Sequence, residues 1–99
     1  MANALQLTLV SPDKVLFEGD VQYVSVPGGA GYFGVLVDHA PTIASLVPGD
    51  VEIRPAGGVP IKFRISAPGF FEVANNKVSI LLDSADSGVY QQPAVVASF

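Results

Sequence analysis

Hydrophobic and polar residues alternate along most of this 99-residue chain. A period of two places every second side chain on the same face of an extended strand, so the pattern predicts short strands with one buried face. The alternation is clearest near the end of the chain, where two apolar stretches flank a pair of asparagines. In chain order, the predicted strands lie at 5–9, 15–17, 24–26, 51–53, 61–65, 71–73 and 78–82.

Turn-forming residues separate these strands. The segment SPDK at 11–14 follows the first strand, Glu18-Gly19-Asp20 ends the second, and Pro27-Gly28-Gly29 ends the third. PAGG at 55–58 separates the next two strands. Asn75-Asn76 tolerates the positive φ angles of a type I′ turn, which predicts a tight hairpin there.

Helical periodicity is weak throughout. The best candidate, 39–46, is interrupted by one proline and ends just before another, and only 84–99 could otherwise be helical, where Gly88 and Pro93 cut it short. At this spacing the whole chain would hold eight or nine short strands, which with its ten glycines and eight prolines predict one all-β domain, a sandwich or a barrel.

Composition narrows the function classes. The chain has no cysteine, which excludes disulfides, thiolate metal sites and a thiol nucleophile. Only five residues are Lys or Arg and the net charge is −4, so the sequence lacks the basic residues that would contact the phosphates of a nucleic acid. Charged residues make up 14% against 49% hydrophobic ones, an apolar surplus that predicts a surface covered by a protein partner.

Targeting signals are also missing from the pattern. The first ten residues have no basic segment, so we expect no signal peptide. The longest uncharged stretch, 21–37, is interrupted by Pro27 and several glycines, so it does not read as a membrane-spanning helix. We therefore expect a soluble intracellular protein.

The stretch 29–34, GAGYFG, matches the dinucleotide-binding pattern G-x-G-x-x-G, and Asp50 follows about twenty residues later. That chemistry needs the third glycine to open a helix, whereas a β-branched run and a proline follow here. A tight loop or bulge between strands is the favoured interpretation. We expect the Phe33 side chain to point into the core and Tyr32, at the opposite parity, to point outward as a docking group.

His39 is the only histidine, and no sequence signature places a nucleophile or a set of metal ligands beside it. A turn residue whose ring bonds a backbone group is the favoured interpretation. Asp83 and Asp86 lie close together in the sequence, but beyond the last strand they read as solvated acids. The sequence offers no catalytic constellation.

Several motifs follow one another along the chain: V-S-P then F-E-G, the loop V-P-G-x-x-G-x-F-G-V-L, D-H-A-P, P-G-D-V-E-I and the hairpin G-F-F-E-V-x-x-N-K-V. In this order they resemble the N-terminal domain of the epsilon subunit of F-type ATP synthases. The resemblance extends from residue 4 to about residue 86. It implies a flattened β-sandwich of about ten short strands over residues 1–86, followed by a C-terminal tail, 87–99.

The resemblance implies a rotor subunit in the central stalk, without catalysis, metal or cofactor. Its partners would be the gamma subunit, the ring of c subunits and, indirectly, the catalytic alpha and beta subunits. It would lie peripherally at the cytoplasmic face of the bacterial inner membrane, touching the membrane only through the complex, and couple proton-driven rotation to ATP synthesis. The residues expected to contact the ring are Gly28, Gly29, Gly31, Tyr32, Phe33 and Gly34, with His39 and Pro41 in the adjoining turn.

Two departures from the family pattern stand out. Many members have an acidic residue where this chain has Tyr32, so an aromatic contact would replace a charged one. The tail 87–99 is too short for the family's C-terminal pair of helices, which inhibits ATP hydrolysis, so we expect a short form without that domain. The alternative function is a small sandwich that binds a ligand or peptide, using Tyr23, Tyr32 and Tyr90 as stacking platforms.

Overall fold

The computed structural model describes residues 3–82 and 90–93, and every regular element in these residues is a strand. No helix there is long and apolar enough to cross a membrane. The strands are β1 (Leu5–Ser11), β2 (Lys14–Gly28), β3 (Gly31–Leu36), β4 (Thr42–Leu46), β5 (Gly49–Pro55), β6 (Ile61–Ile65), β7 (Gly69–Ala74), β8 (Lys77–Leu82) and β9 (Tyr90–Pro93). The all-β prediction is confirmed.

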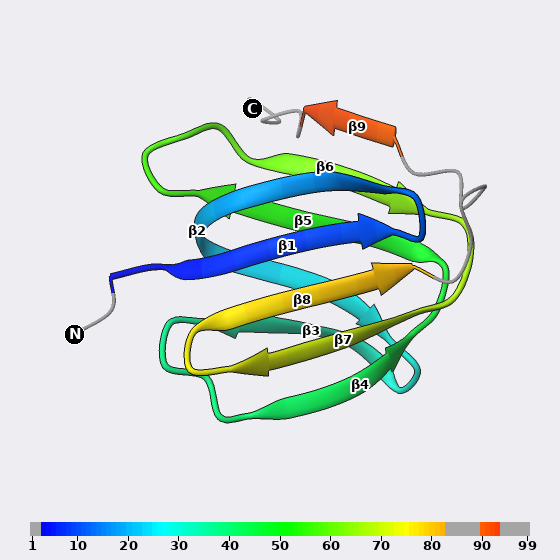
Figure 1. Cartoon of the computed structure of the whole chain (residues 1–99), viewed down its shortest axis with the longest axis horizontal. Coiled ribbons are helices and arrows are strands. Elements are labelled where there is room, and N and C mark those ends of the chain that lie inside the picture. The colour runs from blue at the N-terminus through cyan, green and yellow to red at the C-terminus, as the bar shows by residue number, and fades with distance from the viewer. Residues whose placement is uncertain (1–2, 83–89, 94–99) are drawn as a thin grey trace, which may run out of the picture.

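The strands form two layers packed face to face (Figure 1). One layer has the order β4–β7–β8–β1 and continues into the first half of β2. The other has the order β3, second half of β2, β5, β6 and β9. The β1–β8 pair is parallel and the other pairs are antiparallel. Because β2 belongs to both layers, it closes one side of the sandwich.

The predicted end of a strand at Glu18-Gly19-Asp20 is wrong. These three residues continue the ladder, opposite Thr8, Leu7 and Gln6 of β1. A glycine weakens a strand locally, but pairing with a neighbour satisfies its backbone and outweighs the turn signal. The break in pairing comes later, where the register with β5 shifts between Val21 and Tyr23. There β2 passes from one layer to the other and remains one strand of 15 residues.

The core lies between the two layers and is made of the inward half of each alternating pattern. Edge-to-face aromatic contacts lock the layers: Phe33 packs on Phe71 with ring centroids 5.4 Å apart, and Phe17 on Phe63 at 6.1 Å. The buried apolar residues are Leu5, Leu7, Leu9, Val21, Val24, Val26, Val35, Leu46, Val51, Ile53, Phe63, Ile65, Phe71, Val73, Val78, Ile80 and Leu82.

Three local predictions from the sequence can be compared directly with the structure. Asn75 and Asn76 have φ angles of 52° and 60°, so the predicted type I′ turn joins β7 to β8. The stretch 39–46, where the prolines argued against a helix, contains β4. Within 84–99, where a helix was considered, residues 90–93 form β9 and pair with β6. The rest of that stretch, with Asp83, lies outside the described residues, and the boundary between 86 and 87 stays a prediction.

Candidate functional site

The eight predicted contact residues fall into two groups at opposite ends of β3. Gly28 to Gly34 belong to the hairpin of β2 and β3, whereas His39 and Pro41 lie in the turn between β3 and β4. Figure 1 shows the hairpin tip at one end of the sandwich and the β3–β4 turn at the other. One compact contact therefore does not include both groups.

The glycine run forms a two-residue hairpin. Gly28 pairs with Gly31, so residues 29 and 30 make the turn, and the φ angle of Gly31 is 129°, which only glycine adopts readily. Gly34 lies inside β3, opposite Ser25. The dinucleotide pattern needs a helix to open at this glycine, and a strand takes its place. The loop interpretation of the run is therefore confirmed.

Tyr32 and Phe33 point to opposite sides, as predicted. Phe33 is half-buried and packs on Phe71, whereas Tyr32 is 61% exposed. The Tyr32 hydroxyl is nevertheless fixed, because it accepts a hydrogen bond from the backbone N–H of Asp50 at 3.0 Å. It also lies over Gly49, where a Cβ atom would come within 2.7 Å of the hydroxyl oxygen. Tyr32 is thus an exposed ring held in one place beside the turn between β4 and β5.

The β3–β4 turn is built from backbone contacts. The Nδ1 atom of His39 lies 2.7 Å from the carbonyl oxygen of Ala40, so His39 is the turn residue that its sequence context favoured. The hydroxyl of Thr42 donates to the same carbonyl at 3.0 Å. Pro41 is exposed. Among the described residues, no group of three His, Asp or Glu side chains could hold a metal ion.

The outer face of the β3–β2–β5–β6 layer carries two ion pairs and the exposed side chain of Leu36. Arg64 forms an ion pair with Asp50 at 2.9 Å, and Arg54 forms one with Glu52 at 3.3 Å. The guanidinium of Arg54 also lies over the ring of Tyr23, 4.8 Å from its centroid. Tyr23 is therefore engaged within this face and does not stand free as a stacking platform; the side chain of Tyr90 lies outside the described residues.

The outer face of the other layer carries a row of apolar side chains, which was not predicted from the sequence. Phe70 of β7 pairs with Leu81 of β8, which pairs with Val10 of β1, which pairs with Val15 of β2. These four side chains form a row across the layer, and Ile43 of β4, 77% exposed, lies one row away. We call these five residues the apolar face.

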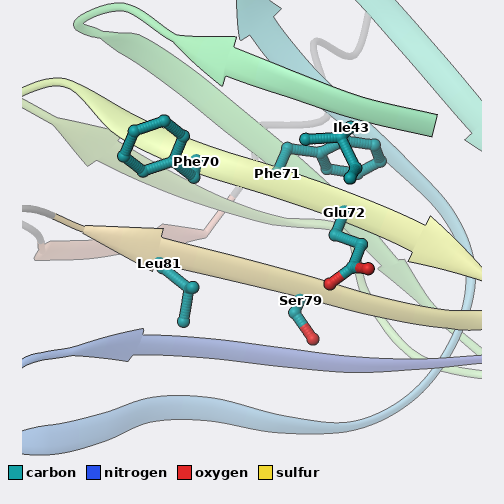
Figure 2. Close-up of a pocket in the computed structure, with 6 residues that line it drawn as sticks. All are labelled: Ile43, Phe70, Phe71, Glu72, Ser79 and Leu81. Carbon is teal, nitrogen blue, oxygen red and sulfur yellow. The ribbon is translucent and has the colours of Figure 1, made fainter.

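A shallow pocket of about 180 Å³ lies in the apolar face. Figure 2 shows side chains of β4, β7 and β8 around it, with Glu72 and Ser79 adding polar atoms at one side. The sequence does carry a signal for this surface. In the doublets Phe70-Phe71 and Leu81-Leu82, one apolar residue points into the core and its neighbour points outward.

Comparison with known families gives one match across most of the chain. Residues 4–88 match the model of the β-sandwich domain of the ATP synthase delta/epsilon chain. This range includes the hairpin tip, the β3–β4 turn and all five residues of the apolar face.

Relatives agree with this match. An ATP synthase epsilon chain of Leptospira interrogans is 43% identical over 82 residues, which cover 83% of this chain and 63% of that protein. ATP synthase epsilon chain 1 of Nitrobacter hamburgensis is 47% identical over 79 residues, 80% of this chain and 57% of that protein. The chain thus spans less than two thirds of the length of these relatives.

Solved structures agree in fold. A chain of the Euglena gracilis mitochondrial ATP synthase, in a structure of its OSCP, F1 and c-ring, superposes with a TM-score of 0.78 at 26% identity. That match covers 94% of this chain and 55% of the other. A chain of the Tetrahymena thermophila central stalk and c-ring superposes at 0.66 with 16% identity, covering 89% and 66%, and shows the fold alone.

Proposed function

The chain belongs to the family of ATP synthase delta/epsilon-chain β-sandwich domains, and from this premise we propose that it is a non-catalytic rotor subunit of the central stalk. In this role it binds the gamma subunit and the ring of c subunits, and so couples proton-driven rotation of the ring to ATP synthesis. The catalytic alpha and beta subunits are reached indirectly through gamma. The whole complex would hold it at the cytoplasmic face of the bacterial inner membrane.

The difference between the two outer faces carries the proposal. On one face Arg54 and Arg64 are held in ion pairs. The apolar face instead exposes Ile43, Phe70 and Leu81 to water at 77%, 53% and 49%. A contiguous exposed apolar surface on a small soluble domain is typical of a permanent protein interface. We assign the apolar face to gamma.

The hairpin tip is the proposed contact with the ring. No residue from 21 to 37 is charged. The tip presents the side chain of Tyr32, and the exposed Val47 and Pro48 lie beside it in the turn between β4 and β5. The bond from Val47 N–H to the Pro27 carbonyl, 2.9 Å, holds that turn against the tip. A fixed, uncharged aromatic side chain is better suited to packing against a protein loop than to pairing with a charged residue.

Titration of the chain with the gamma subunit of the same organism tests the proposal. A permanent subunit interface buries well over ~1,000 Å². We therefore expect a stable one-to-one complex of nanomolar affinity by calorimetry and sedimentation. ATP added to the isolated chain should produce no binding heat. Two components that sediment separately at micromolar concentration would contradict the gamma assignment, and an ATP response would instead favour the ligand-binding alternative.

A further inference from the structure

Asn76 ties together three segments that lie far apart in the sequence. Its side-chain oxygen accepts the backbone N–H of Asp38 at 2.6 Å, and its side-chain N–H donates to the Asp38 carboxylate at 3.0 Å. Its backbone carbonyl accepts the N–H of Gln6 at 2.8 Å. One residue of the β7–β8 turn thus holds the β3–β4 turn and the start of β1.

The Asp38 backbone needs such a support. Its φ angle of 69° lies in the left-handed region, which costs a non-glycine residue free energy and persists where the surroundings fix it. The two reciprocal hydrogen bonds with Asn76 fix both the N–H and the carboxylate of this residue. The bond from His39 N–H to the Leu36 carbonyl, 3.2 Å, completes the turn.

The turn by itself does not require an asparagine at this position. A type I′ turn has positive φ at both central residues, and glycine meets that requirement at no steric cost. Glycine at position 76 would make the same turn and lose both side-chain bonds to Asp38. The asparagine thus supplies something that the hairpin itself does not need.

We infer that Asn76 is a positioning residue whose side chain sets the β3–β4 turn and, through it, the start of β4. Ile43 is the second residue of that strand and the most exposed member of the apolar face. We call the two hydrogen bonds between the Asn76 side chain and Asp38 the clamp. Loss of the clamp frees the turn and lets Ile43 shift on the surface proposed to bind gamma. The clamp itself is argued from these hydrogen bonds, whereas its effect on gamma binding rests on the proposed function.

The variant Asn76→Gly tests the clamp, with Asn75→Gly as the matched control in the same turn. Both variants keep the type I′ backbone, but only the first removes the bonds to Asp38. Hydrogen exchange on the isolated chain should be about fivefold faster at the Asp38 amide in Asn76→Gly and unchanged in Asn75→Gly, since one hydrogen bond contributes on the order of 1 kcal/mol. Equal exchange in both variants overturns the inference.

A gamma titration tests the positioning role separately. We expect Asn76→Gly to bind several-fold more weakly than the wild type, and Asn75→Gly and Asp38→Asn to bind like the wild type. Asp38→Asn keeps a side-chain oxygen that can accept the hydrogen bond from Asn76, and asparagine tolerates positive φ, so this variant serves as the conservative control. Faster exchange at Asp38 with unchanged gamma affinity overturns the positioning role. A wild type that does not bind gamma overturns the proposed function, while the exchange result still decides the clamp.

Discussion

Replacement of Phe70 by threonine separates binding from folding on the apolar face. Phe70 is 53% exposed on β7, so a partner that covers it removes about 100 Å² from water, taking about 200 Å² for the whole side chain. At about 25 cal/mol per Å² this area contributes roughly 2.5 kcal/mol, and roughly 2 kcal/mol after allowance for the threonine methyl. The expected loss of gamma affinity is therefore about 30-fold.

Stability should fall by no more than affinity. About half of the Phe70 side chain is buried within the domain, and threonine favours strands, so the same area arithmetic gives a loss of roughly 2 kcal/mol at most in the free energy of unfolding. The matched control is Leu36→Thr, because Leu36 is 61% exposed on the outer face of the opposite layer. Calorimetric titration with gamma and urea unfolding of each variant provide the two readouts.

Two results would refute this reasoning. Wild-type affinity for Phe70→Thr means that gamma does not cover the apolar face. An equal loss for Leu36→Thr means that the two outer faces are not distinguished by the partner. A large loss of stability in Phe70→Thr would show instead that Phe70 acts as a core residue, and Phe71→Ala, expected to cost about 3–5 kcal/mol, gives the scale for that case.

Further predictions concern the hairpin tip and two glycines. Tyr32→Phe removes the hydroxyl that accepts the Asp50 N–H, so the melting temperature should fall by about 4–8 °C, and an unchanged value would show that this bond contributes nothing. Tyr32→Asp should clearly lower the rate of coupled ATP synthesis in the reconstituted complex, whereas the melting temperature of the chain should fall by no more than in Tyr32→Phe. At Gly69 a Cβ would lie 2.6 Å from the Leu81 carbonyl oxygen, so Gly69→Ala should cost about 2 kcal/mol in urea unfolding. Gly29→Ala meets nothing within 4 Å and should stay within about 0.5 kcal/mol of the wild type; equal effects at both glycines would contradict the close approach.

Part of the candidate site was predictable because it depends on neighbours in the sequence. Alternation of side chains is a property of any extended strand, so Phe33 inward and Tyr32 outward follow from parity once a strand passes through both. The grouping of the hairpin tip with His39 and Pro41 could not be judged in the same way. Closeness in sequence suggested one surface, but six residues of extended β3 carry the chain from one end of the sandwich to the other.

The sequence by itself determined the strand-rich fold and the tight turn at Asn75-Asn76, because periodicity and positive φ are local preferences. Tertiary pairing decided that β2 runs unbroken through Gly19, since the ladder with β1 satisfies the backbone there. It also decided that Phe70, Leu81, Val10 and Val15 stand in one row, because register between strands distant in sequence sets that alignment. The second role of Asn76 likewise exists only where the folded chain brings Asp38 beside it, at a separation of 38 residues.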